Sequence, residues 1–215
     1  MTILALEFSS ARRSVAVWHA GGVAEALETG GRGMNAFSLI KKVLAESGST
    51  REQIEVIAVG LGPGSYTGIR VALSIAQGWQ LARGVKLLGI SSAECLAAQA
   101  QAEQISGRVN VVIDAQRNEF YLASYEVSPG GCKEMESLRI VPLSEIQSRA
   151  HGGEIWIGPE VTRWLPKGKI LFPPAAALGR LAAGRGDFVN GGQLTPIYLR
   201  EANFVKAPAR DPIAY

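Results

Sequence analysis

The stretch from Gly60 to Arg70 reads G-L-G-P-G-S-Y-T-G-I-R, and it constrains the fold more than any other part of the sequence. An apolar run at 56–59 leads into it, and a long helix-like run at 69–83 leaves it. This layout predicts a strand, a tight glycine turn and the start of a helix. The backbone N–H groups of such a turn and the positive end of a helix can hold a phosphate or a partner's backbone.

Two interpretations of this turn stay open. Its glycines permit positive φ and close approach of a ligand, and its hydroxyls can cap the helix or bind an anion. However, no P-loop lysine follows Gly68, and Thr67 stands where a dinucleotide fingerprint beginning at Gly62 needs glycine, so a purely structural turn is an equal alternative. The candidate residues for phosphate or nucleotide contact are Gly62, Gly64, Ser65, Thr67, Gly68 and Asp114.

The order of the predicted elements runs twice along the chain. Strands are predicted at 2–7, 14–19, 23–28, 56–60 and 86–90, with helices at 36–46, 69–83 and 91–101. After residue 107 the order begins again. Strands are predicted at 109–113 and 120–127, with a third ending near 141, and then at 155–157 and 169–172. Helices are predicted at 143–150 and 175–183, and a helical turn at 161–165. Short connections favour antiparallel neighbours among the first strands of each pass.

The repeated order predicts an α/β fold of two duplicated lobes, each a mixed sheet flanked by helices. We expect residues 1–105 in the first lobe and 106–215 in the second, with the final segment from about 196 packing back on the first. Two such lobes enclose a cleft at the carboxyl ends of their strands. Glu7 and Asp114 each end the first strand of one pass, where they could hold hydrated magnesium or merely cap a turn.

Composition restricts the classes of function. The chain of 215 residues carries 22 basic and 19 acidic side chains, a formal charge of +3, without a long run of one sign. Strong direct binding of nucleic acid is therefore not indicated. No apolar stretch approaches the length of a membrane span and no targeting signal is recognisable, so we expect a cytoplasmic protein with two reduced cysteines.

Several strings resemble the bacterial TsaB family, also called YeaZ, which belongs to the superfamily of actin, sugar kinases and Hsp70. They are G-P-G-S-Y-T-G-I-R with the small-residue helix after it, L-L-G-I-S-S-A-E-C-L-A at 87–97, V-I-D-A-Q-R-N-E-F-Y at 112–121 and T-P-I-Y-L-R at 195–200. Two positions depart from the family pattern. Glu7 replaces the aspartate of I-D-T-S, and the stretch from Asn35 to Lys41 replaces a histidine-led segment.

The resemblance implies two actin-like lobes of the ribonuclease H type and a role in making threonylcarbamoyladenosine in tRNA. It implies a non-catalytic subunit that binds the catalytic subunit TsaD, with the ATPase TsaE joining them, and that meets tRNA only through this complex. We expect no metal and no cofactor on the chain alone, with ATP or ADP bound only together with TsaD. Alone, the chain is expected to form a homodimer.

The residues themselves agree with a docking role. The helix at 69–83 is apolar nearly all round, with one stripe of Ile69, Ala72, Leu73 and Ala76 and a second of Val71, Ile75, Trp79 and Ala82. One side can lie on the chain's own sheet and the other on a second chain, although burial of both inside this domain is the alternative. The residues selected for the partner interface are Phe37, Ile40, Leu44, Arg70, Ala72, Leu73, Ala76 and Gln77.

Two alternative functions differ in how well the residues support them. A free-standing ATP-dependent small-molecule kinase is the alternative that the glycine turn, Glu7 and Asp114 suggest, although the chain is short for such a kinase. A metallopeptidase lacks its ligands, because the chain has only His19 and His151 and no H-E-x-x-H motif. No catalytic residue is therefore predicted.

Overall fold

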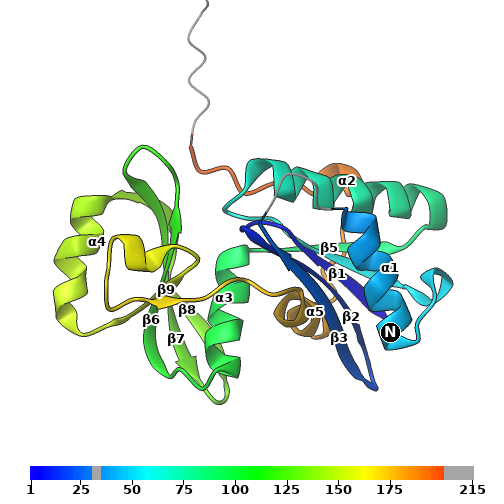
Figure 1. The fold of residues 1–215 in the computed structure, drawn as a ribbon, viewed down its shortest axis with the longest axis horizontal. Helices are drawn as coiled ribbons and strands as arrows, with labels where there is room; N and C mark the ends of the chain where they lie inside the picture. The colour runs from blue at the N-terminus through cyan, green and yellow to red at the C-terminus, as the bar shows by residue number, and fades with distance from the viewer. Residues whose placement is uncertain (31–34, 201–215) are drawn as a thin grey trace, which may run out of the picture.

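The computed structural model describes residues 1–30 and 35–200, which form two five-stranded mixed sheets with helices around them (Figure 1). The strand order is β3-β2-β1-β4-β5 in the first sheet and β10-β9-β6-β7-β8 in the second. In each sheet the first three strands along the chain are antiparallel neighbours, and the last two continue the sheet in parallel. This repetition confirms the prediction of an α/β fold with two duplicated lobes, each a mixed sheet flanked by helices.

The strands lie close to their predicted positions. Those of the first sheet are β1 (Ile3–Glu7), β2 (Arg12–His19), β3 (Gly22–Thr29), β4 (Val56–Gly60) and β5 (Lys86–Ile90). Those of the second sheet are β6 (Gly107–Asp114), β7 (Glu119–Ser128), β8 (Gly131–Pro142), β9 (Ile155–Gly158) and β10 (Lys169–Ile170). The last strand is shorter than the predicted 169–172, because pairing with β9 ends at Ile170 and the chain then turns toward the first lobe.

Helices α1 (Ala36–Ser47) and α2 (Tyr66–Arg83) cover one face of the first sheet (Figure 1). Asn35 caps α1 by accepting hydrogen bonds from the backbone of Phe37 and Ser38, and Gly48 ends the helix in the left-handed conformation. Ser65 caps α2 through the backbone N–H of Gly68. The side chains between these two helices and the sheet form a buried core of branched aliphatic and small residues.

Helices α3 (Ser92–Ala102) and α5 (Ala175–Ala183) do not stay with the half of the chain that contains them. α3 packs on the second sheet, whereas α5 packs on β1 and β2 of the first sheet. The predicted division at 105/106 thus separates the two sheets but not their helices, and the return to the first lobe begins near 173 rather than 196. Both helices are rich in alanine. Their apolar periodicity indicates which face of each helix is buried, but it does not indicate which of the two sheets covers that face.

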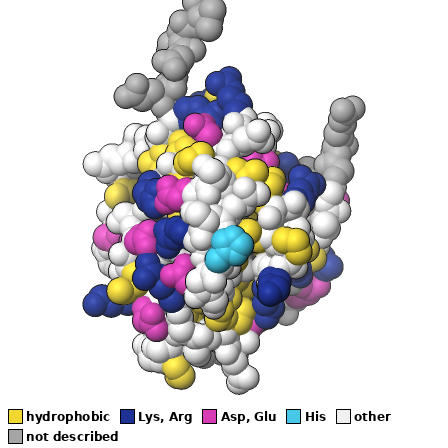
Figure 2. Space-filling view, turned by 90° about the vertical axis from the view of Figure 1, so that its left-hand side faces the viewer, with side chains coloured by type: hydrophobic (Ala, Val, Ile, Leu, Met, Phe, Trp, Pro, Cys, Tyr) yellow, Lys and Arg dark blue, Asp and Glu magenta, His cyan; other side chains and the backbone are white. Residues whose placement is uncertain are grey.

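The second lobe has thinner helical cover than the first. Its helix α4 (Leu143–Arg149) is short, and a 3₁₀ turn at Val161–Arg163 stands where the first lobe has α2. A polar network fills part of the space: Asn110 and Ser124 are buried and hydrogen-bonded to each other, and Arg149 donates to Asn110 and pairs with Glu136. Figure 2 shows basic and acidic side chains interspersed at this end of the molecule, so this face carries no extended patch of one charge.

The segment after α5 runs back along the first lobe. Val189 bridges to Leu87 of β5, Leu194 is buried in the core beneath α2, and the Ile197 N–H donates to the Leu61 carbonyl at 2.9 Å. Within the described residues, none of the helices combines the length and the apolar character that a membrane crossing requires.

Candidate functional site

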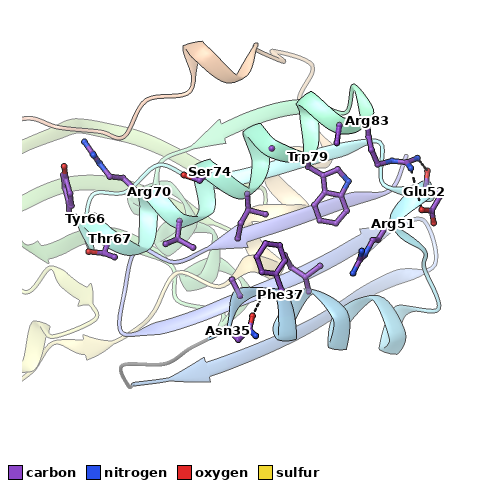
Figure 3. A pocket seen from close by; sticks show the side chains of 16 residues that line it. Asn35, Phe37, Arg51, Glu52, Tyr66, Thr67, Arg70, Ser74, Trp79 and Arg83 are labelled. Atoms are coloured by element: carbon purple, nitrogen blue, oxygen red, sulfur yellow. Dashed lines mark hydrogen bonds and ion pairs between the residues drawn. The ribbon is translucent and has the colours of Figure 1, made fainter.

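A groove opens on the surface of the first lobe between α1 and α2 (Figure 3). Its volume is about 1110 Å³, and its apolar lining includes Phe37, Val71, Ile75, Trp79 and Ala82. Figure 3 shows the rings of Phe37 and Trp79 lying toward the same space, one from each helix. The groove is therefore an apolar channel between two helices rather than a pocket at the end of a sheet.

The two ends of the groove are charged or aromatic. Tyr66 and Arg70 stand at the end near the glycine turn, and the Arg70 guanidinium lies over the Tyr66 ring at 4.2 Å from its centre. At the other end Arg83 forms an ion pair with Glu52, and Arg51 lines the wall beside it. The groove thus combines an apolar floor with arginines at both ends, the composition that recurs at the centres of protein interfaces.

Phe37 has 66 % of its surface exposed and Tyr66 has 54 %. Inside the wall, the indole N–H of Trp79 is buried and finds no acceptor among the described residues. An unmade hydrogen bond of this kind costs about 1–3 kcal/mol. The exposed aromatic rings and the unbonded indole N–H both make the uncovered groove less stable than a covered one would be.

Most of the residues selected from the sequence for the interface lie inside the protein. Ala72, Leu73 and Ala76 are at most 5 % exposed, because this stripe of α2 packs on the chain's own sheet. Ile40 and Leu44 on α1 are buried in the same core, at 2 % and 6 % exposure, although Ile40 also reaches the groove. In the isolated chain these five residues belong to the buried core, and their assignment to a partner interface stays a prediction. The sequence identifies both stripes of α2, and the second stripe is the one that faces outward.

Three selected residues, Phe37, Ile40 and Arg70, line the groove. Gln77 lies on the other side of α2, where its side-chain amide donates to the Gly191 carbonyl at 2.8 Å and ties down the C-terminal segment. Sequence reasoning did not select Tyr66, Arg51, Glu52 or Arg83, which come together only when the helices are placed. The signal for the second stripe was present in the spacing of Val71, Ile75, Trp79 and Ala82.

The glycines of the turn serve close packing. A Cβ at Gly64 would stand 2.1 Å from the Ser9 carbonyl oxygen, and one at Gly68 would stand 2.0 Å from that of Phe8. The Ser65 N–H donates to Ser9 at 2.6 Å. The turn therefore packs tightly against the loop after β1, and at least one of its backbone N–H groups is already hydrogen-bonded within the protein.

The other candidates in the turn are placed differently. Gly62 is buried with φ of 87°, and its carbonyl accepts from the Ser92 N–H at 2.8 Å. Thr67 is exposed and lines the groove, while Gly64 and Ser65 also reach the cleft between the lobes. The structure therefore does not gather the six candidates for nucleotide contact around one point.

The cleft between the lobes has a volume of about 490 Å³ and is lined by Asp114, Glu160 and Arg163 from the second lobe. Asp114 accepts a hydrogen bond from the Gln116 N–H at 2.7 Å, which is the turn-capping role. Burial raises the pKa of Glu160, and the nearby Asp114 charge acts in the same direction. Within 1–30 and 35–200, no three His, Cys, Asp or Glu side chains are grouped as metal ligands.

Glu7 does not reach this cleft. It is fully buried, accepts from the Ser9 N–H at 2.8 Å and from the Ser92 hydroxyl at 3.0 Å, and burial raises its pKa. These contacts tie the end of β1 to the first turn of α3. Glu7 and Asp114 are therefore not two halves of one site.

Comparison with known proteins places this architecture in a family. Residues 33–198 match the family model of TsaD, described as tRNA N6-adenosine threonylcarbamoyltransferase. The crystal structure of a Pseudomonas aeruginosa protein, described as similar to the peptidase YEAZ, is 30% identical with a TM-score of 0.79, over 93% of this chain and 99% of that one. The chain belongs to the TsaB (YeaZ) family. A second Pseudomonas aeruginosa structure, named YeaZ, is 27% identical with a TM-score of 0.78, over 92% and 99% of the two chains.

Several curated relatives carry the name tRNA threonylcarbamoyladenosine biosynthesis protein TsaB. The one from Escherichia coli is 29% identical over 219 residues, which cover 93% of this chain and 95% of the relative. The one from Haemophilus influenzae is 34% identical over 125 residues, which cover 57% and 53%. The first comparison spans both lobes, so the likeness of this TsaB-family chain is to a whole relative and not to a single lobe.

Proposed function

We propose that this protein takes part in the biosynthesis of threonylcarbamoyladenosine in tRNA, as a non-catalytic subunit in the cytoplasm. It binds a TsaD-type catalytic subunit, works with a TsaE-type ATPase, and meets tRNA only through the complex. The names of the TsaB relatives support the pathway. The observation that carries the docking role is the apolar groove between α1 and α2, with Phe37 exposed on its rim.

The groove suits a protein partner for physical reasons. An aromatic side chain as exposed as Phe37 gains from removal from water, at about 25 cal/mol per Å² of apolar surface. A partner helix laid between α1 and α2 would cover Phe37 and Val71 together, while Arg70 and Arg51 at the ends could meet its carboxylates or carbonyls. The match to the TsaD model supports a partner built on the same fold, and hence with comparable helices.

The same surface suits a second copy of this chain when the partner is absent. A two-fold axis through the groove would place α1 and α2 of one copy against those of the other, and each contact would occur twice. We therefore propose a homodimer that TsaD displaces. The two assemblies exclude each other because both use the groove.

A matched pair of variants on α2 tests this proposal. Val71→Glu puts a carboxylate into the groove, whereas Leu81→Glu makes the same change at a residue that is 91 % exposed and does not line the groove. Each variant is mixed with TsaD of the same organism. Complex size is measured by light scattering, and transfer of the threonylcarbamoyl group to tRNA is measured with TsaE and ATP present.

We expect the native chain and Leu81→Glu to bind TsaD and to support transfer, while the chain alone transfers nothing. Val71→Glu should weaken the complex by at least about 100-fold, since burial of an unpaired charge costs several kcal/mol. Failure of the native chain to co-elute with TsaD would count against the proposal. Turnover of ATP on a small alcohol by the chain alone would favour the kinase alternative instead.

A further inference from the structure

Three segments that lie far apart in the sequence meet beside the cleft. The start of α2 contributes Tyr66 and Arg70, and the segment at 195–200 contributes Tyr198 and Arg200. The third is the turn between β6 and β7, where Arg200 makes its contacts. Two of these segments belong to the first lobe and the third to the second, so the meeting point joins the lobes.

The turn after β6 has an unfavourable backbone. Gln116, Arg117 and Asn118 are all left-handed, with φ of 65°, 59° and 58°. Residues with a Cβ rarely adopt this conformation even singly, and three in succession persist only where the surroundings hold them. Within the turn, the Ala115 N–H donates to the Glu119 carbonyl at 2.9 Å and the Glu119 N–H donates to the Gln116 carbonyl at 3.1 Å.

Arg200 holds this turn from outside. Its guanidinium donates to the Ala115 carbonyl at 2.9 Å and to the Gln116 carbonyl at 3.3 Å, and it forms an ion pair with Glu119. One positive group thus satisfies acceptors at both ends of the left-handed stretch. Its side chain is only 33 % exposed, which strengthens these contacts relative to a surface pair.

Tyr198 fixes the same segment to the first lobe. Its ring stacks on Tyr66 with centroids 5.9 Å apart, and its hydroxyl accepts a hydrogen bond from Arg70 Nε at 3.2 Å. The backbone of the preceding residue, Ile197, is bonded to Leu61, and both Ile197 and Tyr198 line the cleft. Only Leu199 separates Tyr198, which contacts the first lobe, from Arg200, which contacts the second.

We propose that residues 197–200 form an interlobe latch, which holds the left-handed turn of the second lobe from an anchor on the first. Arg70 is shared between this latch and the groove, since it lines the groove and also holds Tyr198. A change at the groove therefore reaches the turn in the cleft through Arg70, Tyr198 and Arg200. This inference goes beyond docking and does not depend on it, because every contact lies within one chain.

Amide hydrogen exchange of the full chain, resolved by NMR, tests the latch. The reporters are the amides of Ala115 and Glu119, whose hydrogen bonds close the turn. The variants are Arg200→Gln, which removes the charge from the turn, and Arg70→Gln, which removes the contact on Tyr198 from the groove side. Leu199→Ala is the matched control, because Leu199 lies in the same segment and is 41 % exposed.

We expect Arg200→Gln to speed exchange at both reporters by about tenfold and Arg70→Gln by about threefold, through local opening of the turn. Leu199→Ala should leave both rates unchanged, and the amides of β4 should keep their protection in every variant. Unchanged reporters in either arginine variant overturn the latch. Equal acceleration at the turn and in β4 also overturns it, because that result describes general loss of stability.

Discussion

Gly60 lies so close to Glu7 that a Cβ at position 60 would stand 1.9 Å from Glu7 Oε2. Gly60 ends β4 and Glu7 ends the neighbouring β1, so the carboxylate occupies the space that a side chain on β4 would need. The glutamate at this position is therefore matched by a residue without a side chain. Glu7 and Gly60 therefore pack against each other, and the Glu7 carboxylate is used in this contact and not as a metal ligand.

Gly60→Ala should destabilise the protein by at least about 2 kcal/mol, because the new methyl group and the carboxylate cannot both keep their places. Glu7→Asp withdraws the carboxylate and should recover about half of that loss when combined with Gly60→Ala. The measurement is a double-mutant cycle in urea. Strict additivity of the two changes would show that the contact between the side chains is not the cause.

The stability of the protein should fall as the pH rises through the range that Glu7 controls. Burial raises the pKa of Glu7 above its ordinary value of 4.5, so between 4.5 and the folded value the native state binds more protons than the unfolded state. Glu7→Gln removes this titration. The free energy of unfolding of Glu7→Gln minus that of the native chain should therefore increase with pH from about 4 upward, then level off.

Glu136→Gln provides a control of opposite sign. Hydrogen bonding to Arg149 lowers the pKa of Glu136, so its contribution is present above the ordinary value of 4.5 and is lost as the pH falls through the folded value. The difference between Glu136→Gln and the native chain should accordingly shrink on acidification. If both differences rise with pH, the Glu136 assignment is contradicted, and if both fall with pH, the Glu7 assignment is contradicted.

Local signals in the sequence located most elements because they act over a few residues. Strands β4 and β5 and helix α5 have the predicted bounds. The sequence Thr50-x-x-Gln53 has the spacing that predicts a capping box, and the box is present, since the Thr50 N–H donates to the Gln53 side chain at 2.8 Å. Asn35, which departs from the family pattern, is the N-cap of α1. Each of these depends on contacts within about four residues, which a sequence displays directly.

What the sequence left open depends on contacts between distant segments. The sequence Ser91-x-x-Glu94 has the spacing that predicts a capping box, but only half of the box forms. Ser91 caps α3, whereas Glu94 pairs with Arg185, which is far along the chain. Likewise, the pattern of α2 revealed two apolar stripes without showing which one the sheet would cover. The small side chains of Ala72 and Ala76 fit against β-strands, and the larger Trp79 is left at the groove.

Ala72→Glu and Val71→Glu should therefore behave differently although they are neighbours on one helix. Ala72 is fully buried and Val71 is 37 % exposed, so the carboxylate at position 72 would be placed in the core without a partner. We expect Ala72→Glu to lose about 3 kcal/mol or more of stability, and Val71→Glu less than about 1 kcal/mol. The measurement is thermal unfolding of the two variants, each without a partner. Equal losses of stability would show that the α2 stripe containing Val71 lies inside the core and does not face the groove.

ATP should not stabilise this chain in isolation. A ligand bound only by the native state raises stability by RT ln(1 + [L]/Kd), so ATP at about a hundred times its Kd would add about 2.7 kcal/mol and visibly raise Tm. Because Gly64 and Gly68 are packed against the carbonyls of Ser9 and Phe8, we expect no shift with ATP and magnesium. Gly64→Ala should have a lower Tm than the native chain, by the same amount with and without ATP, because the role of Gly64 is steric. A rise in Tm for the native chain that Gly64→Ala abolishes would instead assign the turn to phosphate binding and restore the kinase alternative.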